Sequence, residues 1–513
     1  MQTILRVGKP ASPPSHPTVR SCRTGIAPAA LIAFAWSALV ATAGLAQSSE
    51  APSPDDRRRQ VERLILAPVV PVADLGKAVS LLERMATSKV PGLSLAVIED
   101  GEIAWARGYG TKEVDGKQPI EPETLLLAGS ISKPVAATVG LRMAQEGALQ
   151  LDRDVNEQLE SWKVPYPELA GDEKVTMRRL LSHSAGLTVH GFPGYPKDAA
   201  IPSGPQILDG VEPANTGPVR IDLVPGSEWR YSGGGYTVFQ VLVEDVSGMG
   251  FAEVAREKVL RPFGMTSSTF ANPLPSTLHE QAAIGHWPTG VRVPSRWHTY
   301  PEMAAAGLWT TATDLARWAI GIQDAFSGGS EAVLNQEWAT TMLEEQINEW
   351  GLGPAVAGEG EALRFSHGGR DAGYDALLIA YPRTGQGAVA MINANNNSGF
   401  LSEVMETIAR VYDWPGERAQ QRGYIELTKK QLDAVAGRYE FTNDNERVNF
   451  RRKDGALHAV AQSFGRIVFY PESENEFFDG SGRELIFRKS SDGTWSHFEW
   501  RRGDTTFPGK RVD

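Results

Sequence analysis

The sequence predicts a large α+β domain followed by a small all-β domain. Strand-turn-strand patterns occur at residues 93–105 and 376–392, and a helical pattern begins after Leu126 between them. Strands at both ends with helices between them indicate an α+β domain closed by its own two ends. From Leu432 onward, short alternating runs are separated by Asp-Gly, Ser-Gly and Gly turns, which is typical of a β domain.

The first 46 residues have the pattern of a secretory signal peptide. They carry four basic residues and no acidic one, and an apolar run from Ile26 to Leu45 ends in small residues. The run also approaches the length of a membrane span, so an uncleaved anchor is the alternative. Cys22 precedes the run, which argues against a lipoprotein signal. We therefore expect residues 1–46 to be removed, leaving a periplasmic or secreted protein without stable membrane insertion.

The composition of the 513-residue chain excludes several classes of protein. Hydrophobic residues make up 41% of the chain, which is ample for a packed core and excludes disorder of the whole chain. The formal net charge is −11, and −15 without the signal, so we expect no nucleic-acid partner. Cys22 is the only cysteine, so the mature chain can form neither a disulfide nor a cysteine-based zinc site.

Four segments follow the signal. Residues 47–72 begin with a polar stretch rich in Pro and Ser and are expected to form a flexible leader. The α+β domain is expected to span 73–413, a linker 414–428, and the all-β domain 429–513. An amphipathic helix is predicted at 73–89, where apolar residues recur at helical spacing: Leu75, Val79, Leu82 and Met85.

Residues 189–225 are rich in Pro and Gly and show no clear periodicity. A long irregular stretch inside a compact domain usually has a function. We expect this one to form a wall of a binding site.

Ser130 and Lys133 form a Ser-x-x-Lys pattern. If a helix begins here, the two side chains share one face. A serine hydroxyl needs a neighbouring base, and a desolvated lysine amine can be that base. A helix start also directs backbone N–H groups at a developing oxyanion. The alternative is an N-cap serine beside a solvated lysine.

Two further motifs place a tyrosine and a histidine beside glycines. Tyr231 precedes the glycine run 233–235, which allows close approach of the backbone. A lysine cation beside the phenol is expected to lower its pKa, so that it can shuttle protons; the alternative is a turn with a packing tyrosine. His367 is followed by Gly368 and Gly369 just before the strand at 376–380, which suggests close backbone approach to a ligand.

In this order, the three motifs resemble the signatures of the serine β-lactamase and D,D-peptidase superfamily, particularly its class C-like esterase and aminopeptidase branch. Those signatures are Ser-x-x-Lys, Tyr-x-Asn, and Lys-Thr-Gly or His-x-Gly. Segments 180–187 and 306–315 are also similar to the family, and the resemblance covers about residues 75–410. It implies a β-lactamase-like fold, with an antiparallel sheet flanked by helices and an all-helical subdomain. The C-terminal domain is similar to the lipocalin-like barrels of some members.

The resemblance also implies a mechanism. Ser130 would be the acylated nucleophile, with Lys133 and Tyr231 sharing the acid and base work. The backbone N–H groups of Ser130 and Arg370 would form the oxyanion hole. His183 would be structural, because its segment is structural in this family. The substrate would be a small molecule, short peptide or ester, including peptides that contain D-amino acids.

Two positions depart from the family pattern. Gly233 would lie in the substrate-binding part of the site, where the family has asparagine, so the amide that holds a substrate's acyl side chain is missing. His367 and Gly369 belong to a His-x-Gly element, and the histidine replaces a lysine. Near its ordinary pKa of ~6.5, a histidine has only partial positive charge at neutral pH. Both changes weaken recognition of an anionic lactam and favour an esterase, amidase or peptidase.

A true β-lactamase and a non-catalytic penicillin-recognising sensor are the alternatives. A zincin is excluded because His279-Glu280 is followed by Ala283, where that motif has its second histidine. The sequence has no Gly-x-Ser-x-Gly elbow and no dinucleotide or phosphate loop. We therefore expect no metal and no cofactor. The sequence leaves the oligomeric state open.

Overall fold

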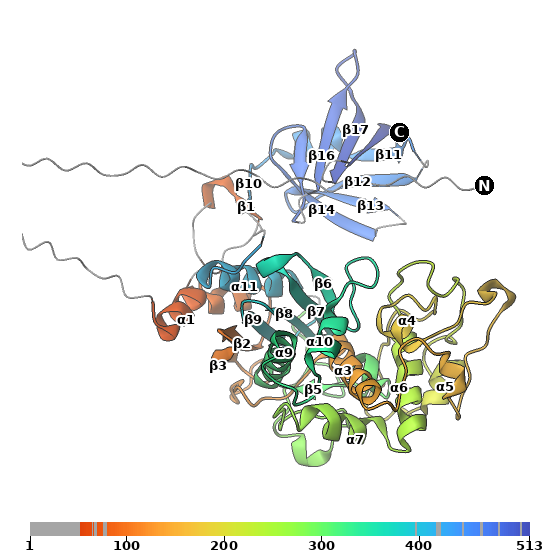
Figure 1. The fold of residues 1–513 in the computed structure, drawn as a ribbon. Coiled ribbons are helices and arrows are strands. Elements are labelled where there is room, and N and C mark those ends of the chain that lie inside the picture. Colours follow the sequence, from red (N-terminus) through yellow and green to blue (C-terminus); the bar gives the residue numbers. More distant parts are fainter. Residues whose placement is uncertain are drawn as a thin grey trace, which may run out of the picture. The chain divides into compact units, whose positions relative to one another are not determined.

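The computed structural model describes residues 52–513, except 64, 66–68, 75–78, 396–397, 417–421, 444–445, 462–464, 481–482 and 503–504. The predicted signal at 1–46 lies outside the described residues. The described chain contains a six-stranded sheet with its helices and a closed barrel of eight strands near the C-terminus (Figure 1). Both predicted portions, α+β and β, are therefore present.

The two ends of the α+β portion meet in the six-stranded sheet, as the sequence predicted. Its order is β3-β2-β9-β8-β7-β6, and all neighbours are antiparallel. The early strand β2 pairs with the late strand β9, and Leu93 lies opposite Ile392. The strands are β2 (Gly92–Glu99), β3 (Glu102–Gly110), β6 (Ala355–Ala357), β7 (Arg364–Asp371), β8 (Tyr374–Tyr381) and β9 (Gln386–Ile392), with a separate pair β4 (Leu126–Leu127) and β5 (Trp309–Thr310).

Helices cover both faces of this sheet (Figure 1). Alternate residues of β2 point to opposite faces: Leu95 packs in one core with α11, and Ile98 packs in the other core with α9. Helices α3 to α8 form a mainly helical region beside the sheet, as the resemblance implied. The helices are α1 (Pro54–Arg63), α2 (Leu81–Thr87), α3 (Ser132–Gln145), α4 (Met177–Leu181), α5 (Gly204–Asp209), α6 (Gly233–Ser247), α7 (Phe251–Ala255), α8 (Met303–Ala306), α9 (Ala312–Ser327), α10 (Gln336–Leu343), α11 (Ser398–Val411) and α12 (Lys429–Val435).

In the part of the chain that the structure describes, none of the helices combines the length and the apolar character needed to cross a membrane.

The segment expected to be a flexible leader contains helix α1. Arg58 pairs with Asp55 and Glu62, three residues before it and four after it, and such pairs support an exposed helix. Val61 is fully buried and packs in the same core as α11. The polar composition concealed the helix, because its one buried side chain gives no periodic signal.

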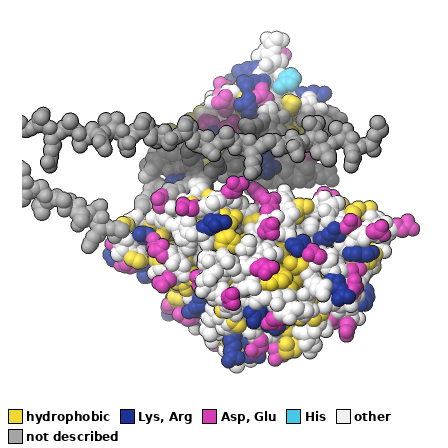
Figure 2. Space-filling view, in the orientation of Figure 1, with side chains coloured by type: hydrophobic (Ala, Val, Ile, Leu, Met, Phe, Trp, Pro, Cys, Tyr) yellow, Lys and Arg dark blue, Asp and Glu magenta, His cyan; other side chains and the backbone are white. Residues whose placement is uncertain are grey.

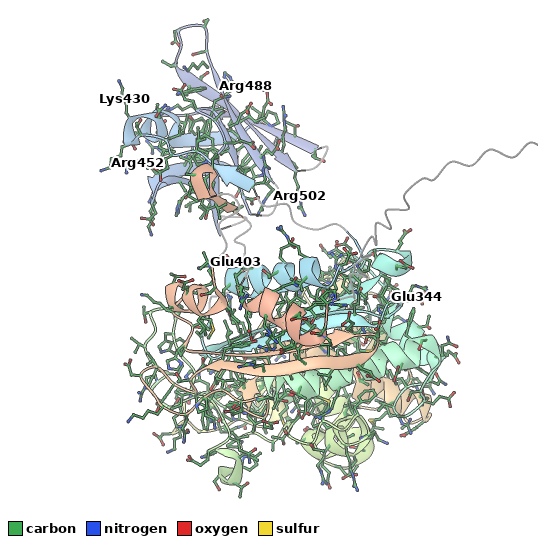
Figure 3. All side chains as sticks on the ribbon, turned by 90° about the vertical axis from the view of Figure 1, so that its left-hand side faces the viewer. Glu344, Glu403, Lys430, Arg452, Arg488 and Arg502 are labelled. Atoms are coloured by element: carbon green, nitrogen blue, oxygen red, sulfur yellow. The ribbon has the colours of Figure 1, made fainter. Side chains whose placement is uncertain are left out.

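Helix α2 is shorter than predicted, and its buried face matches the expected one only in part: Met85 is buried as expected, Val79 precedes the helix, and Leu75 lies outside the described residues. The helix begins at Leu81, after Ser80 caps it through a reciprocal hydrogen bond with Glu83. Leu81 is buried, whereas Leu82, which we expected on the apolar face, is 61% exposed. Glu403 on α11, labelled in Figure 3, accepts hydrogen bonds from Arg84 at 2.5 and 2.8 Å, which tie α2 to α11.

Residues 189–225 are irregular apart from the short helix α5, in agreement with the predicted loop.

Acidic and basic side chains are interspersed on the face of the molecule shown in Figure 2.

The C-terminal strands close into a barrel because β18 pairs back with β11. Aromatic rings meet edge to face inside it; Phe450 and Phe487, for example, lie 5.3 Å apart. An eight-stranded barrel is just wide enough for side chains to fill it. The predicted β domain also includes helix α12, which adds Leu432 and Val435 to this core. The strands are β11 (Gly437–Phe441), β12 (Arg447–Lys453), β13 (Ala456–Ala461), β14 (Gly465–Pro471), β15 (Glu476–Phe478), β16 (Glu484–Lys489), β17 (Trp495–Arg502) and β18 (Thr505–Arg511).

The segment expected to be a linker contains a short strand. β10 (Arg422–Tyr424) pairs in parallel with β1 (Val69–Pro71), so the segments before and after the α+β portion meet.

Candidate active site

Ser130 lies in a 3-10 turn that leads into α3. Gly129 in this turn has φ +54°, and a Cβ there would lie 2.3 Å from the backbone nitrogen of Arg370. A Cβ at Gly369 would lie 1.9 Å from the carbonyl oxygen of Ala128. Both positions therefore need glycine so that the Ser130 turn can pack directly against β7.

Lys133 lies in the first turn of α3 and is 2% exposed. Its Nζ donates hydrogen bonds to Ser130 Oγ at 3.0 Å and to the Ala305 carbonyl at 2.8 Å. Burial lowers the pKa of Lys133 to about 7, although the nearby Asp371 carboxyl acts in the opposite direction. A substantial fraction of the amine is therefore neutral at neutral pH and can accept a proton.

Tyr231 lies in the irregular link before α6, and its side chain is hydrogen-bonded to Ser130. The Lys133 ammonium lies 4.8 Å from the centre of its ring. The expectation that the lysine would lower the phenol's pKa is wrong: burial raises the pKa of Tyr231, and the Ser130 hydrogen bond offsets only part of this effect. Tyr231 therefore remains a protonated phenol, which can donate a proton.

His367 on β7 is buried, and its Nδ1 donates to the Gly368 carbonyl at 2.6 Å. Burial, with the neighbouring Lys133 cation, lowers the pKa of His367 to about 3. The expected partial positive charge at neutral pH is therefore wrong. The neutral ring leaves Nε2 as an acceptor, and this atom has no hydrogen-bond partner among the described residues.

The side chain of Arg370 lines the cavity, in addition to the backbone N–H expected in the oxyanion hole. Its Nε and Nη2 donate to the two carboxylate oxygens of Asp375 at 2.7 and 3.1 Å. Asp375 is buried, whereas the Arg370 side chain is about half exposed. The two residues lie directly opposite each other in the β7–β8 hairpin, which fixes the pair.

Gly233 does not line the cavity above Ser130. It is the first residue of α6, and its N–H donates to the His190 carbonyl at 3.1 Å. A Cβ there would lie 3.0 Å from the Phe192 ring. A side chain at this position would therefore meet the loop at 190–192, and the proposed substrate-binding role of Gly233 is not supported by its position.

A cavity of about 490 Å³ opens over these groups. The sequence-predicted residues that line it are Ser130, Tyr231, His367, Gly369 and Arg370, and Lys133 lies buried behind Ser130. Sequence reasoning missed several other lining residues, among them His190, Trp350, Asp375 and Leu401. His190 belongs to the irregular segment that we expected to form a wall, so that segment could have indicated it.

A family model for β-lactamases matches residues 81–410, which is more than half of the chain. The chain belongs to the β-lactamase family. Together with the sheet, the helical region and the barrel, this match confirms the predicted fold and the serine β-lactamase and penicillin-binding-protein-like superfamily.

The curated relatives of this member of the β-lactamase family are distant in sequence. Protein flp of Staphylococcus aureus strain N315 is 25% identical over 326 residues, which cover 62% of each chain. Penicillin-binding protein 4* of Bacillus subtilis strain 168 is 23% identical over 410 residues, which cover 74% of this chain and 86% of that protein. The chain thus spans less than two thirds of the length of flp.

Solved structures show the same β-lactamase-like fold. The octameric penicillin-binding protein homologue from Pyrococcus abyssi has a TM-score of 0.56 and 21% identity, and the match covers 84% of this chain and 98% of that one. The structure of SurE with D-Leu has a TM-score of 0.53 and 20% identity, with 84% and 97% covered.

Proposed function

We propose that this protein is a serine hydrolase that forms an acyl-enzyme on Ser130 and cleaves an amide or ester bond. The observation that carries the proposal is the 3.0 Å hydrogen bond from Lys133 Nζ to Ser130 Oγ, made by an amine whose pKa burial lowers to about 7. Neutral Lys133 takes the Ser130 proton while Oγ attacks the carbonyl carbon. The Tyr231 phenol, hydrogen-bonded to Ser130, is placed to protonate the leaving amine or alcohol.

The remaining steps follow from the same groups. The oxyanion that forms on attack is stabilised by the backbone N–H groups of Ser130 and Arg370, which the close packing of the turn against β7 supports. The bond to the leaving group breaks, and the tyrosinate recovers a proton from Lys133. Water then attacks the acyl carbon and gives its proton to the neutral Lys133 amine, and Lys133 returns that proton to Ser130 Oγ as the acyl C–O bond breaks.

His367 favours a neutral group of the substrate over an anionic one. Its Nε2, which has no partner among the residues that the structure describes, is a buried acceptor without charge. An acceptor suits an amide N–H or a hydroxyl, whereas a β-lactam carboxylate needs a cation or a donor. We therefore propose an amidase, peptidase or esterase acting on small molecules or short peptides, including peptides with D-amino acids, rather than a lactamase. That the related fold of SurE was solved with D-Leu is consistent with this substrate class.

The N-terminal pattern adds a proposal about location. A basic segment, an apolar run and small residues at its end indicate export to the periplasm or the medium, with cleavage near Ala46. N-terminal sequencing of the mature protein tests this proposal, and a retained apolar run would indicate an anchor.

The hydrolase proposal is tested by labelling with a fluorophosphonate probe and by a panel of nitrocefin, p-nitrophenyl butyrate and D-alanyl amides. We expect labelling of Ser130, loss of labelling in Ser130→Ala, and turnover of the ester or amides. Ser132→Ala is the matched control, because this buried hydroxyl accepts from the Leu308 N–H and should leave labelling intact. Stable labelling without any turnover would indicate the sensor instead, and rapid nitrocefin turnover would indicate a lactamase.

A further inference from the structure

His183 contacts three consecutive residues of the segment that contains Tyr231. Its carbonyl accepts the Arg230 N–H at 2.8 Å, and its Nδ1 accepts the Ser232 N–H at 3.1 Å. Between these two bonds, its ring stacks on Tyr231, with the ring centres 4.1 Å apart and the planes tilted by 31°. His183 therefore binds the residue before Tyr231, the Tyr231 ring and the residue after it.

The local structure makes Tyr231 dependent on these contacts. Tyr231 lies in an irregular link that ends at Ser232, the N-cap of α6, so no helix hydrogen bonds hold its backbone. His183 has φ +60°, which lets its ring and its carbonyl face the same segment. This left-handed conformation is uncommon outside glycine, although histidine, like asparagine and aspartate, adopts it more often than other residues do. A strained backbone that bridges to a reactive side chain suggests a function.

The His183 imidazole is neutral, and its Nδ1 is the hydrogen-bond acceptor. Since Nδ1 accepts the Ser232 N–H, the ring proton lies on Nε2, and the ring is neutral. Burial and the Lys133 cation hold the pKa of His183 well below its ordinary value. His183 is 1% exposed and also contacts the rings of Trp350 and Tyr236, at 5.2 and 5.3 Å. His183 therefore cannot reach substrate and can act only through the residues it touches.

We propose that His183 is a positioning residue that holds the Tyr231 phenol against Ser130. This inference rests on the proposed hydrolase function, in which Tyr231 protonates the leaving group. It replaces the purely structural role that the resemblance implied for His183. A phenol that shifts by an ångström would lose its alignment with Ser130, and a misplacement of that size can lower a rate by about 100-fold.

A double-mutant cycle with His183→Ala and Tyr231→Phe tests the inference, with kcat, KM and the rate of fluorophosphonate labelling as readouts. We expect His183→Ala to lower kcat by about 10- to 100-fold with KM nearly unchanged, since the ring does not bind substrate. In the Tyr231→Phe background, the same change should lower kcat by less than about 3-fold, because the group that it positions is already absent. His183→Asn tolerates the left-handed backbone and keeps an acceptor, so it should recover part of the rate.

A matched control separates positioning from general destabilisation. His286 is also fully buried; its Nε2 accepts the Val114 N–H, and its Nδ1 bonds to the Asn393 carbonyl, but it has no contact with Tyr231. His286→Asn should change kcat by the same factor in both backgrounds. The inference is overturned if His183→Ala lowers kcat equally in both backgrounds, or if folded His183→Asn and His183→Ala both keep the wild-type rate. Absence of Ser130 labelling in the wild-type protein would instead overturn the proposed hydrolase.

Discussion

Lys133 should make the acylation of Ser130 depend on pH near neutrality. Burial lowers its pKa from 10.5 to about 7, and only the neutral amine can accept the Ser130 proton. We therefore expect the rate of fluorophosphonate labelling to rise with pH, to be half-maximal near pH 7 and to level off above it.

The same pKa has a consequence for stability, and its sign follows from linkage. The pKa of Lys133 is lower in the folded chain than in the unfolded chain, so burial of the cation destabilises the fold most at low pH. The lowered pKa reduces the free energy of unfolding by about 5 kcal/mol at about pH 6. At about pH 9 the reduction is only about 2 kcal/mol, because the folded amine is already neutral and the unfolded amine begins to lose its proton. Lys133→Met removes this cost but also removes the hydrogen bond to Ala305, which offsets about 1 kcal/mol.

Denaturant unfolding of the wild type and Lys133→Met, followed by tryptophan fluorescence, measures this difference. We expect the inactive variant to be more stable near pH 6, with an advantage about 3 kcal/mol smaller near pH 9. Lys258→Met is the control: Lys258 forms a surface ion pair with Glu146, and its loss should change stability by about 1 kcal/mol or less at both pH values. A stability difference that is the same at both pH values, or a labelling rate that is flat across neutrality, would refute the role of Lys133.

Two further predictions concern packing. Gly369→Ala should lower kcat/KM by about 100-fold in a hydrolysis assay, because its Cβ would collide with the Ala128 carbonyl and displace β7 from the nucleophile. Gly368→Ala should lose far less, since its Cβ would meet only the Ala376 carbonyl at 3.9 Å; equal losses would contradict this account. Phe450→Ala should lower the unfolding free energy of the barrel by about 3–5 kcal/mol, because the ring is 1% exposed among other rings; a loss below about 1 kcal/mol by denaturant titration would show a poorly packed interior.

Local patterns predicted much of the fold. The two strand-turn-strand patterns became β2–β3 and β8–β9, because alternation and turn residues act over short distances. The Arg370–Asp375 pair could also have been predicted locally, because a tight turn at 371–374 places the two residues opposite each other. The predicted strand began only at Ala376 and therefore missed this pair.

Burial, in contrast, could not be predicted from local patterns. Lys133, Tyr231 and His367 were expected near the reaction, but their protonation depends on how completely distant segments cover them. His367 is neutral because the fold buries it beside Lys133, which precedes it by about 230 residues in the chain. The place of Gly233 depends likewise on a loop about 40 residues away, which occupies the space where we expected a substrate.

The pairing of β2 with β9 also bears on how the chain acquires activity. The nucleophile's turn is synthesised about 240 residues before the strand that packs against it, and β9 completes the sheet later still. Contacts this far apart in sequence form slowly, since a long loop must close before they stabilise the fold. A nascent or truncated chain that lacks β7 to β9 therefore has a serine and a lysine but no assembled site. Hydrolytic activity should therefore emerge only after nearly the whole α+β portion has been made.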